Sequence, residues 1–83
     1  MIDPTIILLD IYRLQIAGNT PYLPVLQSKY PDHRIEHELE KLLEDGQIEE
    51  RPVKVGIKWV RACWITSAEV LNQCRIMNQE ITR

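Results

Sequence analysis

Apolar and polar residues follow one another along the chain with helical and strand periods, and proline and glycine mark the boundaries between segments. Residues 4–17 are apolar at most positions, which is typical of a helix that is buried on several sides. Asp3 is the expected N-cap of this helix and Pro4 its first residue, and Gly18 is expected to end it. We expect a central core helix; an equally weighted interpretation is that part of it also faces a second subunit.

Two further helices are predicted before residue 47. Thr20 and Pro21 again form a cap followed by proline, and the second helix must end before Pro31, because proline disfavours helical backbone in the preceding residue. Asp32 is the expected cap of the third helix, and Gly46 is expected to end it in the left-handed conformation. The apolar stripe of the third helix is Ile35, Leu39, Leu42 and Leu43.

Residues 48–65 have the alternation and the β-branched and aromatic content of two strands, joined by a turn at Gly56. Pro52 has no N–H to donate within a sheet, so the first strand should have an open edge. Trp59 and Trp64 should lie on opposite faces of the second strand, with one packed on the core.

A last helix is predicted over residues 67–82, because TSAE at 66–69 has the form of a capping box with Thr66 as the cap. Its apolar positions are Val70, Leu71, Cys74, Met77 and Ile81. The chain of 83 residues thus reads as a single α+β domain, residues 1–83, in the order α-α-α-β-β-α. That order is expected of a winged helix-turn-helix domain: a three-helix core, a two-stranded wing and a C-terminal helix. The helix-turn-helix would span about residues 20–46 and the wing about residues 48–65.

Two motifs resemble a known group of proteins. Leu39-x-x-Leu42-x-x-x-Gly46-x-Ile48 resembles the end of the recognition helix and the first wing strand of bacterial winged-helix regulators of the MarR and PadR type. Arg61-x-Cys63-x-Ile65-Thr66 is similar to their second wing strand, which leads into a C-terminal helix. The chain departs from the usual residues at Leu43, Gln47 and Glu69. The resemblance implies a DNA-binding transcriptional regulator that forms a homodimer through the C-terminal helix, with the first helix as an additional candidate for the interface.

The net charge of −2 does not by itself indicate a nucleic-acid ligand, because phosphate binding depends on positive charge. The charge is segregated, however. Residues 36–50 hold seven acidic residues and one lysine, whereas residues 51–61 hold four cations and no acid. A basic wing beside an acidic helix end fits a protein that grips phosphate with the wing. Lysines on an exposed strand edge also protect against aggregation, which is the alternative explanation.

Candidate DNA contacts follow from the side of the third helix opposite its apolar stripe, with the acidic residues, Glu38 among them, mostly flanking this side. The expected major-groove residues are His33, Arg34, His37 and Lys41. In the wing, Lys54 and Lys58 are expected on the DNA backbone or in the minor groove, supported by Arg51 and Arg61. Two further phosphate contacts are Thr20 and Lys29. The plainer interpretation is a solvated helix face held by ion pairs such as Arg34–Glu38.

Other chemistry is sparse in the sequence. His33 and His37 lack the glutamate of an H-E-x-x-H motif and a third ligand nearby, so no metal is expected. No catalytic constellation or cofactor motif is present, and we expect no enzyme activity. Cys63 and Cys74 are expected as reduced, half-buried thiols of a cytoplasmic protein. The apolar N-terminal run is interrupted too early to span a membrane.

The sequence therefore favours a regulator that binds double-stranded DNA as a homodimer. The alternative is a winged-helix module that binds another protein and not DNA. The acidic net charge and the acidic end of the third helix support that alternative.

Overall fold

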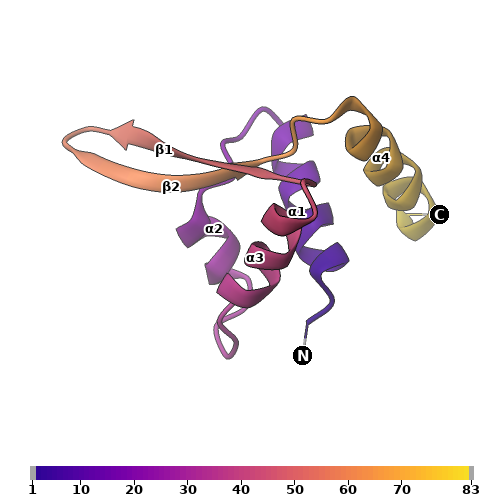
Figure 1. The fold of residues 1–83 in the computed structure, drawn as a ribbon, viewed down its shortest axis with the longest axis horizontal. Coiled ribbons are helices and arrows are strands. Elements are labelled where there is room, and N and C mark those ends of the chain that lie inside the picture. The colour runs from indigo at the N-terminus through magenta and orange to yellow at the C-terminus, as the bar shows by residue number, and fades with distance from the viewer. Residues whose placement is uncertain (1, 83) are drawn as a thin grey trace.

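The predicted order of helices and strands is present in the computed structural model, which describes residues 2–82, with side chains as far as Glu80. The elements are α1 (Pro4–Ile16), α2 (Leu23–Ser28), α3 (Glu36–Glu44), β1 (Glu49–Val55), β2 (Lys58–Trp64) and α4 (Ala68–Thr82). Figure 1 shows the helices grouped around α1, with the hairpin of β1 and β2 extending to one side. The α+β class and the α-α-α-β-β-α order are confirmed.

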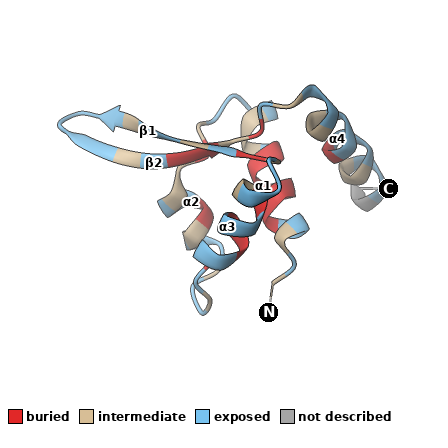
Figure 2. Ribbon diagram, in the orientation of Figure 1, coloured by how far each residue is buried: buried red, intermediate tan, exposed pale blue. Residues whose placement is uncertain are grey.

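Helix α1 is the centre of the fold and packs against α2, α3, α4 and β2. Its side chains Ile7 and Ile11 have no exposed surface, and Figure 2 shows the buried residues gathered along this helix. The prediction of a central core helix is confirmed. Ile6 and Ile16 stay about half exposed, so not every apolar side chain of α1 is used by the core.

Helix α2 begins later than predicted, because the residues before it pair with the hairpin. The carbonyl of Pro21 accepts a hydrogen bond from the N–H of Cys63 at 3.0 Å, and Tyr22 forms an antiparallel bridge with Ala62. This segment is therefore extended, and α2 starts at Leu23. The expected cap at Thr20 is wrong, whereas the predicted end before Pro31 is confirmed.

Helix α3 also begins later than predicted. Ile35, and not Asp32, holds the N-cap position. The side chain of Gln27 shapes the turn before it: its Oε1 accepts from the Ile35 N–H at 3.1 Å, and its Nε2 donates to the carbonyls of His33 at 2.6 Å and Tyr30 at 3.0 Å. The side chain of Gln27, in α2, therefore makes hydrogen bonds in this turn, where a cap at Asp32 was expected.

The rest of α3 follows the sequence pattern. Ile35, Leu39 and Leu42 are buried and Leu43 is partly buried against the core. Gly46 follows the helix with φ +72°, the left-handed conformation that residues with a side chain rarely adopt.

The strands β1 and β2 form an antiparallel hairpin that turns at Gly56. The register places Lys54 opposite Trp59 and Pro52 opposite Arg61. Among the described strands β1 pairs with β2 alone, so its outer edge is open, as Pro52 predicted. The far half of the hairpin projects past α2 (Figure 1).

Helix α4 packs on α1 through Cys74, which is fully buried, and through the partly buried Val70, Leu71 and Met77. Its cap is Ser67, whose Oγ accepts from the Val70 N–H at 3.4 Å, so the predicted cap at Thr66 is one residue too early. The side chain of Ile81, another predicted apolar position, lies outside the described residues. Figure 1 places α4 and the hairpin tip at opposite ends of the molecule's longest dimension, which is 41 Å.

Both cysteines are free and buried, so the prediction of half-buried thiols is wrong. Burial, with a smaller contribution from the charge of Glu50, raises the pKa of the Cys63 thiol to about 11. Burial also raises the pKa of Cys74. The thiolate is the reactive form, so both side chains behave as small core residues.

Candidate nucleic-acid interface

Three of the predicted contact residues lie exposed at the beginning and middle of α3. Arg34 belongs to the turn that precedes the helix, and His37 and Lys41 lie one helical turn apart on its surface. None of the three side chains makes a hydrogen bond or ion pair with another residue in the described part of the chain, so the alternative pair Arg34–Glu38 is not formed. These side chains are therefore exposed to solvent and to any ligand that approaches α3.

His33 is placed differently from the other candidates. It is partly buried, and its Nε2 lies 2.8 Å from Oε1 of Glu38, which is only 2% exposed. The helical projection put His33 outward and Glu38 beside it on the surface. That projection is wrong for both residues. His33 lies in the turn before the helix, which begins only at Glu36, and Glu38 lies within the helix with its carboxylate against the His33 imidazole. His33 is thus directed at a buried carboxylate.

Glu38 is an unusual buried charge. Burial alone would raise its pKa, but the hydrogen bond from His33, its own backbone N–H and the imidazoles of His33 and His37 hold the pKa below the ordinary value. The carboxylate lies in the first turn of α3, where the helix dipole also favours negative charge. Its Oε2 has no hydrogen-bond partner among the described residues. Glu38 therefore links the turn to the helix in its charged form.

A second buried carboxylate, Asp10 of α1, connects α1 to the end of α2. It accepts a hydrogen bond from the Tyr30 hydroxyl, and Arg13 Nη1 and Lys29 Nζ lie 3.8 and 3.9 Å from its Oδ1. Burial and the hydrogen bond to Asp10 raise the pKa of Tyr30 to about 12. Lys29, a predicted phosphate contact, therefore lies beside an internal acid. One signal was present in the sequence: a lone aspartate within an apolar helix needs partners when it is buried.

The two arginines of the hairpin are paired with acidic residues of β1. Arg51 Nη2 lies 3.0 Å from Glu49 Oε2, and Arg61 Nε donates to Glu50 Oε1. The hydrogen bond to Glu50 raises the pKa of Arg61. The base of the hairpin is therefore largely neutralised, which the segregated charge of the sequence did not indicate.

The two lysines of the hairpin lie nearer its tip. Lys54 and Lys58 are exposed and have no ion pair within the described part of the chain. Between them, Ile57 is 92% exposed in the turn. The positive charge of the hairpin is thus concentrated at the end that projects farthest from the helices (Figure 1).

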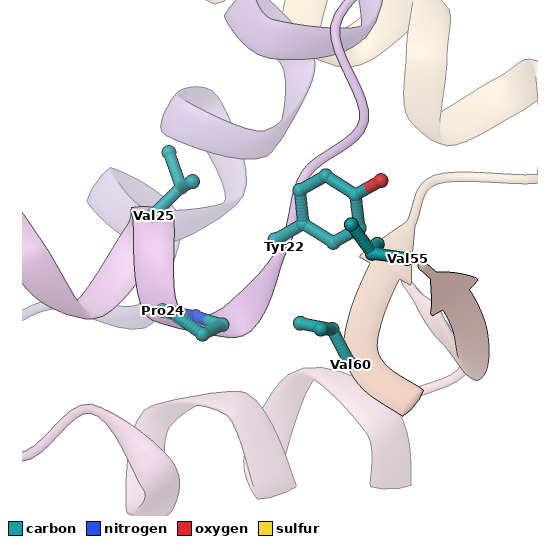
Figure 3. Close-up of a pocket in the computed structure, with 5 residues that line it drawn as sticks. All are labelled: Tyr22, Pro24, Val25, Val55 and Val60. Carbon is teal, nitrogen blue, oxygen red and sulfur yellow. The ribbon is translucent and has the colours of Figure 1, made fainter. Parts of the chain in front are cut away.

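An apolar pocket lies between α2 and the hairpin. Figure 3 shows its lining side chains, Tyr22, Pro24 and Val25 from the α2 side and Val55 and Val60 from the strands. We call this side of the hairpin its inner face. The inner face carries no paired charge at the pocket and is suited to apolar contact.

The comparisons with known proteins add no family to this description. No protein-family model matches the chain, and no curated protein or solved structure matches it significantly. Within residues 2–82, no three His, Cys, Asp or Glu side chains come together as a metal-binding group. None of the described helices has the length and apolar character needed to cross a membrane.

Proposed function

We propose that this chain is a winged-helix protein that binds duplex DNA and regulates transcription. In this proposal α3 is the recognition helix and the hairpin is the wing. The bridge between Tyr22 and Ala62 supports it, because it ties the hairpin to the start of α2. The bonds of Gln27 support it as well, because they hold the turn between α2 and α3 in one conformation. Both elements would then meet a ligand as a preorganised surface.

One observation carries the proposal: five exposed basic side chains without an internal ion pair are gathered at α3, in the turn before it and at the hairpin tip. They are Arg34, His37, Lys41, Lys54 and Lys58, whereas Arg75 lies apart from them on α4. DNA is bound through phosphate by such charges, and a paired cation contributes less. Side chains at the beginning of a recognition helix reach base edges in the major groove. In this proposal Arg34 and His37 would contact base edges, and Lys41 would contact a phosphate.

The acidic residues are compatible with this orientation. Glu44 and Asp45 lie at the far end of α3, where the helix would leave the groove. Glu49 and Glu50 are occupied by the arginines of the hairpin base. Lys54 and Lys58 would contact the DNA backbone beside the groove.

The protein would act as a homodimer with the C-terminal helix α4 and part of α1 at the interface. Ile76 on α4 and Ile6 on α1 are 45% and 49% exposed, and a partner subunit would cover them. A dimer with two-fold symmetry binds two half-sites about one helical turn of DNA apart.

A fluorescence anisotropy titration with random duplex DNA tests the proposal. We expect micromolar or tighter binding at low salt that weakens steeply as salt rises. Replacing Lys54 and Lys58 by alanine should weaken binding to all sequences and reduce the salt slope by about two, roughly one per phosphate contact. Arg75→Ala, an exposed cation of α4, is the matched control and should bind as the wild type. Absence of binding at low salt would contradict the proposal.

A second candidate function is a module that binds another protein. The apolar pocket lined by Tyr22, Val25, Val55 and Val60 favours it, as does the neutralised hairpin base. Such a partner would insert apolar side chains at the inner face of the hairpin. If duplex DNA does not bind at low salt, this function is favoured.

A further inference from the structure

The face of the hairpin opposite the apolar pocket carries an exposed tryptophan among cations. We call it the outer face and define it by Pro52, Lys54, Trp59 and Arg61, whose side chains share one side of the antiparallel pair. All four residues are exposed, and Trp59 is 67% exposed. Trp59 is therefore not part of the core, to which β2 contributes Cys63 at the base of the hairpin.

The register brings the cations next to the indole. Lys54 is the direct cross-strand partner of Trp59, and Arg61 follows Trp59 by two residues on the same face. Directly opposite partners have Cβ atoms about 5 Å apart, which is within reach of an aromatic ring and a lysine stem. Glu50 lies on the same face, two residues before Pro52, and its hydrogen bond with Arg61 neutralises that arginine. The unpaired positive charge beside Trp59 is therefore that of Lys54.

An exposed aromatic ring beside an unpaired lysine fits one ligand chemistry well: a planar apolar group that carries negative charge. An unpaired nucleotide has this form, since its base stacks on aromatic rings and its phosphate is attracted to lysine and arginine. The bases of an intact duplex are stacked on one another and do not offer a free face. The outer face is therefore better suited to an unpaired strand than to an intact duplex.

We propose that the outer face of the hairpin binds single-stranded DNA, with an unpaired base stacked on Trp59 and its phosphate on Lys54. The outer face shares Lys54 with the surface proposed for the duplex, whereas Trp59 has no role in the duplex proposal. The choice of DNA over RNA rests on the proposed function, which brings the hairpin to DNA. A protein with both surfaces binds at a place where duplex and unpaired strand meet.

The fluorescence of Trp59 provides a direct test. In a Trp64→Phe variant Trp59 is the sole indole, because the chain has two tryptophans. Titration with oligo(dT) should quench its emission in a saturable way, and a duplex of equal length should quench it much less. Oligo(dT) that binds without changing the emission would overturn the proposal. Oligo(rU) that binds as tightly as oligo(dT) would overturn the choice of DNA.

Substitutions at Trp59 separate stacking from a role in hairpin stability. Trp59→Leu keeps an apolar side chain but cannot stack and should weaken oligo(dT) binding about tenfold, whereas Trp59→Tyr should lose much less. Binding is measured at a temperature at which circular dichroism shows both variants to be fully folded. Equal affinities for the two variants would contradict stacking. Arg75→Ala on α4 is the charge control and should leave oligo(dT) binding unchanged.

The outcomes also distinguish the two proposals. If oligo(dT) binds through Trp59 while duplex DNA does not bind, the proposed duplex function fails and this inference stands. If duplex DNA binds with the expected salt dependence and oligo(dT) does not, this inference fails alone.

Discussion

Two buried carboxylates connect α1, α2 and α3 at the level of single residues. Asp10 is met by Tyr30, Arg13 and Lys29, and Glu38 is met by His33. A buried charge is tolerated only when partners compensate for lost hydration. These residues therefore determine the conformation of the turn between α2 and α3. Removing one partner should lower the free energy of unfolding of the whole domain.

Tyr30→Phe should lower the free energy of unfolding by about 2 kcal/mol, the usual contribution of a hydrogen bond to a charged group. The folded pKa of Tyr30 is about 12, above the ordinary value of about 10. The contribution is thus fully present below pH 10 and is lost as the pH rises through the folded pKa. Urea unfolding at pH 7 and a spectroscopic titration of tyrosinate measure the two effects.

The control for Tyr30 is Tyr22→Phe, because the Tyr22 hydroxyl makes no hydrogen bond with the described residues. That variant should change stability by less than about 0.5 kcal/mol, as expected of a site without a lost bond. Equal losses in the two variants would contradict the role of the Tyr30–Asp10 hydrogen bond.

Glu38→Gln should destabilise the domain at neutral pH and remove part of its acid sensitivity. The pKa of Glu38 is lowered in the folded protein, so its contribution is present above the unfolded pKa and is lost as the pH falls through the folded value. Thermal unfolding measured from pH 7 down to pH 3 should show a smaller acid-induced loss in the variant. Glu40→Gln, an exposed site on the same helix, should follow the wild-type curve. Identical curves for wild type and Glu38→Gln would contradict this account.

At the level of the elements, the ends of helices and strands depend on a few local residues. Gly46 ends α3 with φ +72°, and no atom within 4 Å would meet an added Cβ, so the cost of a side chain there is backbone strain alone. Gly46→Ala should therefore destabilise the protein by about 1 kcal/mol. Gly46→Asn should cost less, because asparagine tolerates the left-handed region. Chemical unfolding of both variants measures the difference, and an alanine variant as stable as the wild type would contradict the assignment.

The order of the elements could be predicted because its signals are local. Pro4, Gly18, Gly46 and Gly56 stand beside the residues whose conformation they limit. The starts of α2 and α3 could not be predicted in this way. They depend on contacts between segments distant in the sequence, such as the hydrogen bond from Cys63 to the Pro21 carbonyl.

The candidate site was predictable to a similar extent. The exposure of His37 and Lys41 follows from the apolar stripe, which fixes the opposite side of α3. The pairing of Arg61 with Glu50 depends on the register of the hairpin, which the sequence pattern does not specify. The contact of Glu38 with His33 depends on the conformation of the turn before α3. A helical projection holds only within the helix, so it could not place His33, which lies outside it.

In the whole molecule, the surfaces proposed for DNA and for a partner subunit are separated. The hairpin tip and α4 lie at opposite ends of the 41 Å dimension, with α1 between them (Figure 1). A dimer formed through α4 would thus leave both hairpins and both α3 helices uncovered. This arrangement allows two copies to bind neighbouring half-sites without blocking one another.

The most direct test of the central claim is an amide chemical-shift map of the protein titrated with duplex DNA at low salt. The account predicts the largest shifts around Arg34, His37 and Lys41 and between Lys54 and Lys58, with smaller shifts along α4. Added salt should reverse them, since the binding depends on phosphate charge. Shifts confined to α4 or to the apolar pocket, or no shifts at all, would contradict duplex binding by α3 and the hairpin.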